Sequence, residues 1–185
     1  MITNNYNYGI DPANTVQAAI QPWVEWKHLS VGKTHCLTCL KLDKCLFAKN
    51  NMPHLPQHDY CHCMALPKSA LAVQRQAEAV CAYEKFSRYA LDPTNSGNKG
   101  KAAMFESWGY TAVDSGWLVA EYERQALEKY IAGEYVLGVL NMHGQRISIQ
   151  VTLSRKNGIG TVTFTTGWMV EPNGRIRLVT PYGGK

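Results

Sequence analysis

The stretch Arg146–Leu153, which reads RISIQVTL, alternates between apolar and polar residues at every position. A period of two places its apolar side chains on one face of an extended chain, which is typical of a half-buried strand. β-Branched and aromatic residues fill Thr161–Val170, and Pro172-Asn173-Gly174 predicts a turn into a further strand over Arg175–Thr180. We expect Glu134–Asn141 to add another strand. The C-terminal part of the chain therefore predicts an antiparallel meander.

Helical patterns precede these strands. Apolar residues recur at helical spacing over Lys68–Ala90, where no Gly or Pro interrupts them. A short helix is expected over Lys101–Trp108, and a longer one, capped by Asp114 or Ser115, is expected to end near Ala132. Helices followed by strands predict an α+β fold, in which the helices pack on one face of an antiparallel sheet of about four strands.

The 185 residues divide into three predicted parts. Residues 1–22 are polar and short of aliphatic side chains, so we expect a flexible N-terminal arm. Residues 23–67 are rich in Cys, His and Pro and carry little periodic apolar pattern, which predicts a loop-rich module held together by a metal rather than by a core. Residues 68–185 form the α+β domain.

Composition excludes several classes of protein. With 45% hydrophobic and 18% charged residues, the chain does not resemble a disordered, collagenous or coiled-coil sequence. No apolar run approaches the ~20 residues needed to cross a bilayer, and the N-terminus lacks a secretory signal pattern. We therefore expect no membrane contact and a cytosolic location, or export within a larger assembly. A net charge of +5 permits a nucleic acid or acidic partner without predicting either.

Six cysteines in a chain without a signal sequence favour metal binding over disulfides, because the cytosol keeps thiols reduced. Five of them fall between Cys36 and Cys63, interleaved with histidines. The sixth, Cys81, stands alone in a helical pattern and is expected to be a small buried hydrophobic residue.

The spacing of this cluster predicts structural zinc. A Cys-x2-Cys turn brings two thiolates to one ion, and a second Cys/His pair about twenty residues later completes a tetrahedron. The predicted ligands are Cys36, Cys39 and Cys61 with either His58 or Cys63; His58 and Cys61 suit a single turn. An iron–sulfur cluster on Cys36, Cys39, Cys45 and a later cysteine is an alternative, as are reduced thiols without a metal. Catalysis at the metal is not expected, since no motif supplies a general base.

The segment beginning at Trp26 also carries a family resemblance. The stretches CLTCLKLDKC (36–45) and MPHLPQHDYCHC (52–63) resemble the Cys-rich tail of MuF-type phage minor head proteins. The shared order is a Trp, a Cys-x2-Cys, a Leu-Asp pair and a Pro/His segment ending in Cys-x-Cys; Cys45 is extra. The resemblance implies a zinc-binding phage or prophage protein that acts through a protein partner, in the cytoplasm of a bacterial host or on a virion.

A second resemblance covers about 100 residues of the C-terminal part. The stretches KFSRYALDPTNSGNKGKAAMFESWGY (85–110) and TTGWMVEPNGRIRLVTPYGGK (165–185) are similar to a small domain of prophage proteins and bacterial polymorphic toxins. That domain is grouped with barnase, EndoU, colicin and RelE-like ribonucleases. The resemblance implies an alternative function, a metal-independent ribonuclease toxin.

A ribonuclease of this kind needs a general base, a cation for the developing phosphorane charge and an acid for the leaving group. His143 is the only histidine outside the Cys/His-rich segment, and its side chain can titrate near neutral pH. The other candidates are Lys85, Arg88, Lys101, Arg146, Thr166, Thr180 and Tyr182. Trp108, Trp117 and Trp168 are expected in the core or at a partner contact. No nucleotide-binding loop, nucleophile elbow or paired-carboxylate motif is present.

Overall fold

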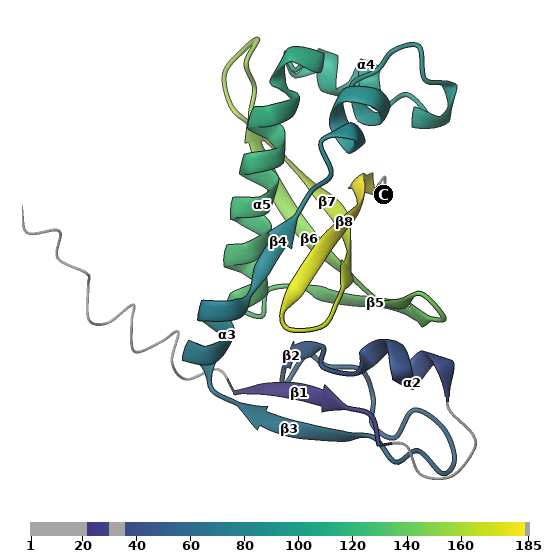
Figure 1. Cartoon of the computed structure of the whole chain (residues 1–185). Coiled ribbons are helices and arrows are strands. Elements are labelled where there is room, and N and C mark those ends of the chain that lie inside the picture. Colours follow the sequence, from purple (N-terminus) through teal and green to yellow (C-terminus); the bar gives the residue numbers. More distant parts are fainter. Residues whose placement is uncertain (1–21, 30–35, 184–185) are drawn as a thin grey trace, which may run out of the picture.

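The computed structural model of the protein describes residues 22–29 and 36–183 (Figure 1). Apart from Pro22, the predicted N-terminal arm lies outside these residues. The described chain forms two sheets, one of three strands near the N-terminus and one of five strands in the C-terminal part. Within the described ranges, no helix combines the length and apolar character needed to cross a bilayer.

The five-stranded sheet contains the predicted meander. Its order is β4-β8-β7-β6-β5, and every neighbouring pair is antiparallel except β4 and β8. The hairpin of β6 and β7 pairs without interruption from Arg146↔Met169 to Ser154↔Thr161. The expected antiparallel sheet is confirmed, and β4 adds a fifth strand in parallel. The strands are β4 (Glu78–Val80), β5 (Val136–Asn141), β6 (Gly144–Ser154), β7 (Thr161–Val170) and β8 (Arg175–Gly183).

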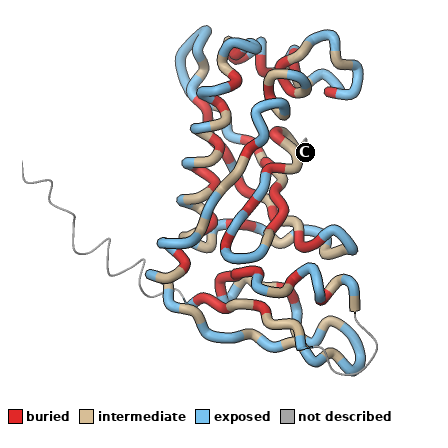
Figure 2. Tube along the Cα trace, viewed as in Figure 1, coloured by how far each residue is buried: buried red, intermediate tan, exposed pale blue. Residues whose placement is uncertain are grey.

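Helices cover one face of this sheet, as predicted (Figure 1). The long helix α5 (Ser115–Ile131) buries Leu118 and Tyr122 and packs against β4 and β6. The Tyr122 ring also meets that of Phe164 on β7, with 6.1 Å between centroids. The Tyr122 hydroxyl donates a hydrogen bond to the Pro181 carbonyl at 3.0 Å, which ties α5 to β8. Alternation in β6 buries Ile147, Ile149, Val151 and Leu153. Buried and less buried stretches alternate along the strands of the sheet in Figure 2. The other elements at this end are η1 (Phe86–Ala90), η2 (Ser96–Asn98), α4 (Lys101–Ser107) and η3 (Ala112–Asp114).

The single helix expected over Lys68–Ala90 is wrong. Ser69 caps a helix, α3 (Ala70–Gln76), by accepting a hydrogen bond from Ala72 N at 3.2 Å, and the chain then becomes extended at Ala77. Glu78–Val80 pairs with β8, and only a π-helical turn follows, η1. The backbone hydrogen bonds that β8 offers outweigh the helical preference of this segment, because propensity is a weak prior against tertiary pairing.

The Cys/His-rich segment folds around a small sheet of its own. Its order is β2-β1-β3, with both pairs antiparallel. Trp23 and Trp26 of β1 are buried, as are all three residues of β2. The expectation that this segment lacks a core is therefore wrong, since a few large aromatic side chains bury as much surface as many small ones. The elements are β1 (Trp23–Lys27), α2 (Leu37–Leu42), β2 (Leu46–Ala48) and β3 (Met64–Lys68).

The two sheets share one hydrophobic core. The ring of Trp23 meets that of Tyr130 edge to face, with 5.3 Å between centroids, and the Tyr130 hydroxyl donates to the Leu46 carbonyl at 2.6 Å. The Tyr135 hydroxyl accepts from Ala48 N at 3.0 Å and donates to the Asn51 carbonyl at 2.7 Å. These contacts join the Cys/His-rich segment to the C-terminal part of the chain as one folded body.

Candidate metal centre

Two segments that are distant in the sequence supply the cysteines and the histidine of the cluster. Cys36 directly precedes α2, and Cys39 lies in the first turn of that helix. His58, Cys61 and Cys63 come from the segment that leads into β3. Cys61 N donates to the His58 carbonyl at 3.2 Å, and Tyr60 between them has a φ of 59°. This tight turn brings His58 and Cys61 to the same side of the loop.

The side-chain atoms converge at distances that suit one metal ion. Cys39 Sγ lies 3.4 Å from His58 Nε2 and 3.9 Å from Cys61 Sγ. Two sulfurs that each lie ~2.3 Å from one ion at tetrahedral angles are about 3.8 Å apart. The clustered residues form two groups that share Cys39, each with its ligand atoms within 4.8 Å of one another: Cys36, Cys39 and His58, and Cys39, Cys61 and Cys63. These are the five residues that the sequence analysis names, and together they could hold a metal ion.

The His58 ring is oriented for this role. Its Nδ1 lies 2.7 Å from the Asp59 carbonyl, so Nδ1 carries the proton and donates to that oxygen. The other nitrogen, Nε2, then presents its lone pair toward Cys39. A ligating histidine in proteins commonly gives its second N–H to a carbonyl or carboxylate in this way. The same carbonyl raises the pKa of His58.

Thiolate character is unevenly distributed among the cysteines. The backbone N–H of Cys39 lowers the pKa of Cys36. Partial burial raises the pKa of Cys61, but the backbone N–H groups of Gln57 and Cys63 outweigh it and bring the pKa to about 7. Burial raises the pKa of Cys39 strongly. All six cysteines are free thiols, so the cluster holds no disulfide. The lowered pKa values of Cys36 and Cys61 stabilise the thiolate, which is the form that binds metal, relative to an ordinary cysteine.

Trp26 in β1 and His28, which directly follows β1, are neighbours of Cys63. The sequence analysis did not identify them as neighbours of the cluster. His28 Nδ1 lies 3.5 Å from Cys63 Sγ, and His28 N donates to Asp43 Oδ1 at 2.9 Å. Burial raises the pKa of Cys63, and the Trp26 N–H opposes that rise. The signal in the sequence is their spacing of two, which in an extended chain places both side chains on one face.

The other cysteine and histidines that the structure describes in this segment, Cys45, His54 and His62, lie outside the cluster. Cys45 is fully buried, with its sulfur 3.5 Å from the Lys41 carbonyl, and it faces the C-terminal sheet near Val170. The prediction of Cys45 as an iron–sulfur ligand is therefore wrong. The chain at the end of α2 directs this side chain into the shared core and away from the cluster. His54 and His62 are exposed outside the cluster. Cys81 is buried, as predicted.

Among the catalytic candidates of the C-terminal domain, Arg146 and Thr180 come together. Both flank Gly167 on the face of the sheet away from α5: a Cβ at Gly167 would lie 3.3 Å from the Arg146 guanidinium and 3.5 Å from Thr180 Cβ. Lys85 lies near Thr180, because its Nζ donates to the carbonyl of the preceding residue, Val179, at 3.1 Å. The absence of a side chain at Gly167 leaves room for the guanidinium to lie across β7.

The structure does not bring the other candidates to this point. Lys101 Nζ donates to the Asn98 carbonyl and lies over the Tyr89 ring. Tyr182 packs against Phe164, and the buried Thr166 hydroxyl donates to the Ile149 carbonyl at 2.7 Å. The remaining two, His143 at the hairpin between β5 and β6 and Arg88 on η1, are exposed. Of the tryptophans, Trp108 and Trp168 are buried and Trp117 is half exposed.

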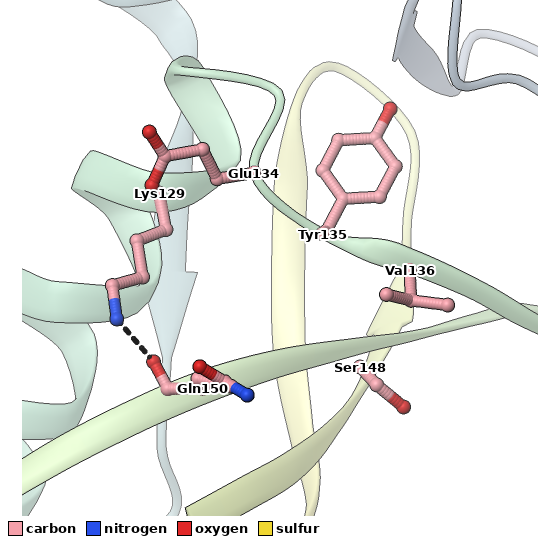
Figure 3. A pocket seen from close by; sticks show the side chains of 6 residues that line it. All are labelled: Lys129, Glu134, Tyr135, Val136, Ser148 and Gln150. Carbon is pink, nitrogen blue, oxygen red and sulfur yellow. Dashed lines mark hydrogen bonds between the residues drawn. The ribbon is translucent and has the colours of Figure 1, made fainter. Parts of the chain in front are cut away.

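A hollow of about 330 Å³ lies beside the end of α5 (Figure 3). Two of its polar groups are already engaged: Lys129 Nζ donates to the Gln150 carbonyl at 2.6 Å, and the Tyr135 hydroxyl accepts from Ala48 N at 3.0 Å. The side chains that line it are Lys129, Glu134, Tyr135, Val136, Ser148 and Gln150. We assign no chemistry to this hollow.

Comparison with known proteins gives one family. Residues 73–185 match the family described as "Domain of unknown function (DUF6883)". The match begins in α3 and covers the whole five-stranded sheet, and it leaves the Cys/His cluster in front of it. No curated protein and no solved structure matches the chain.

Proposed function

From the premise that this chain belongs to the DUF6883 family, we propose that it is a zinc-binding protein whose metal centre shapes a surface for a protein partner. One observation supports the metal: the side chains of Cys36, Cys39, His58 and Cys61 converge, with short sulfur–sulfur and sulfur–nitrogen distances between them. The donors are thiolates and an imidazole, which suit zinc, whereas magnesium and calcium prefer oxygen.

We propose Cys36, Cys39, His58 and Cys61 as the four ligands. His58 presents Nε2 toward Cys39 and shares its group with Cys36. Cys63 is then a neighbour of the site and not a ligand, because its sulfur lies 3.5 Å from His28 Nδ1. Four protein ligands close a tetrahedron and leave no position for substrate, which favours a structural ion over a catalytic one.

The surface around the ligands favours a protein partner. Exposed apolar side chains stand next to the ligands in sequence: Leu37 and Leu40 follow Cys36 and Cys39, and Tyr60 precedes Cys61 with 92% of its surface exposed. Met64, which follows Cys63, is also exposed. Clustered apolar residues of this kind on a folded protein mark interaction sites, and the metal would hold their loops in place.

This proposal predicts that Tyr60→Ala combined with Leu37→Ala abolishes partner binding while leaving zinc bound. The partner recovered with the metal-loaded chain from its native cells should be at least tenfold depleted with the double variant, since interface anchors each contribute ~1–3 kcal/mol. Removal of zinc by a chelator should deplete it as well. Ile159→Ala, at another exposed apolar position, serves as the control. Undiminished recovery with the double variant would exclude this surface.

The alternative is a metal-independent ribonuclease in the C-terminal domain. The observation that favours it is the Arg146 guanidinium, which forms no ion pair within the described residues and lies beside Thr180 across Gly167. A cation in that position could stabilise a phosphorane. The phage origin of the chain stays a prediction from resemblance.

If this alternative holds, the purified chain cleaves RNA and Arg146→Ala reduces the rate by ~100-fold or more, the cost of losing one stabilising charge in a transition state. Arg155→Ala should keep the full rate. An assay with labelled RNA oligonucleotides in the presence of a chelator decides the matter. An inactive wild type, or an Arg146→Ala variant as active as wild type, leaves the interaction function standing.

A further inference from the structure

A cleft lies between the Cys/His-rich segment and the five-stranded sheet. Its volume is about 780 Å³, which is within the range of small-molecule sites. One wall comes from α2, including Lys41, and another from the turn between β7 and β8 with the first residues of β8. His143 and Glu78 complete the polar lining used below. The Lys44 carbonyl accepts from Asn173 N at 2.8 Å, so the two walls are joined at one end.

Three charged side chains on the sheet wall form an ordered group. Glu171 Oε1 accepts from Arg177 Nε at 2.6 Å, and Glu171 Oε2 lies 3.3 Å from Arg175 Nε. Arg175 Nε is also 3.8 Å from Glu78 Oε1. In both arginines the carboxylate meets the Nε side of the guanidinium. Their terminal amino groups make no hydrogen bond with any residue in 22–29 or 36–183.

This arrangement leaves the terminal N–H groups of both arginines available to a ligand. A guanidinium recognises carboxylate and phosphate oxygens through paired N–H groups. A contact between Nε and Glu171 fixes the plane of the guanidinium, so that its terminal N–H groups keep one orientation. The two side chains are two residues apart on β8 and so lie on the same face of the strand. Lys41 on the α2 wall is a third cationic side chain, so the cations of the cleft outnumber its two carboxylates, Glu78 and Glu171.

We propose that this cleft binds a small oxyanion, the phosphate or carboxylate group of an organic molecule, on the terminal amino groups of Arg175 and Arg177. Glu171 is a positioning residue, since it holds both guanidinium groups by their Nε atoms without touching the ligand. The proposal is independent of the proposed zinc-dependent interaction, because the exposed apolar residues of that surface other than Leu40 lie outside the cleft.

The test is a titration of the full chain with inorganic phosphate, followed by NMR of the arginine Nε–Hε groups and backbone amides at constant ionic strength. Saturable shifts are expected at Arg175 and Arg177. Arg177→Ala should weaken phosphate at least tenfold, since a hydrogen bond to a charged group contributes ~1.5–3 kcal/mol. Arg177→Lys keeps the charge but loses the fork, and it should weaken binding as well. The exposed Arg88→Ala variant is the matched control and should bind like wild type.

Acetate titrated in the same way separates the two sources of the oxyanion. Tighter phosphate binding points to a phosphorylated ligand, and tighter acetate binding points to a carboxylic acid. Shifts that chloride reproduces at equal concentration, or an affinity unchanged in Arg177→Ala, would overturn the proposal. If Arg177→Ala fails to fold, Lys41→Ala on the opposite wall replaces it and should weaken phosphate severalfold.

Discussion

Cys39→Ser is expected to remove the metal and unfold the segment that contains β1, α2 and β3. Cys39 is fully buried and is the one residue shared by both groups of the cluster, so its loss leaves neither group complete. Serine is nearly the same size but does not ligate zinc at neutral pH. Structural zinc contributes on the order of 10 kcal/mol to the folding of small modules.

Elemental analysis by plasma mass spectrometry should give one zinc per wild-type chain and close to none for Cys39→Ser. Amide hydrogen exchange should show lost protection over β1 and over residues 36–68. The matched control is Cys45→Ser, the same change at another fully buried cysteine outside the cluster. It should keep its zinc and lose only ~1–3 kcal/mol of stability through a buried hydroxyl. His58→Ala and Cys63→Ala then identify the fourth ligand, and only the first should release zinc. A Cys39→Ser variant that retains zinc would show that the cluster is not the metal site.

Trp23→Ala is expected to lower the free energy of unfolding of the whole chain by about 3–5 kcal/mol. Trp23 is 1% exposed and stands at the junction of the two sheets, where its ring meets that of Tyr130 on α5. The substitution leaves a cavity between β1 and the helix and removes an aromatic pair. Because one core continues through this junction, both sheets should lose stability together.

Urea denaturation followed by fluorescence and by hydrogen exchange measures this effect. The protection of amides in β6 and β7, far from Trp23 in the sequence, should fall along with that of β1. Trp117→Ala is the matched control, since Trp117 is 51% exposed on α5 and should cost less than about 1 kcal/mol. If Trp23→Ala destabilises β1 alone and β6 and β7 keep their protection, the Cys/His-rich segment and the DUF6883 domain fold independently.

Much of the C-terminal fold could be predicted from the sequence because its signals are local. The alternation of Arg146–Leu153 selects a strand with one buried face, and the turn residues Pro172-Asn173-Gly174 specify the hairpin into β8. The helical period of Ser115–Ile131 likewise buries Leu118 and Tyr122. In each case the pattern and the structure it produces lie within about twenty residues.

The cysteine cluster was predictable for a similar reason. Cys36 and Cys39 are held together by a single turn, as are His58 and Cys61, so each pair is close before the chain folds. The separation of Cys45 from this cluster was not predictable. It depends on the direction in which α2 ends, and that direction is set by the packing of Cys45 near Val170 of β7.

The sequence by itself therefore determined the class of the fold, the hairpins, α5 and the five residues of the candidate metal centre. Only the tertiary structure decided that Glu78–Val80 is a strand, that Trp23 and Tyr130 join the two sheets, and that Glu171 orients Arg175 and Arg177 in a cleft. The physical reason is range. Periodicity and turn chemistry report which face of a segment is buried, whereas the choice of the segment that buries it depends on hydrogen bonds and packing between residues distant in the chain.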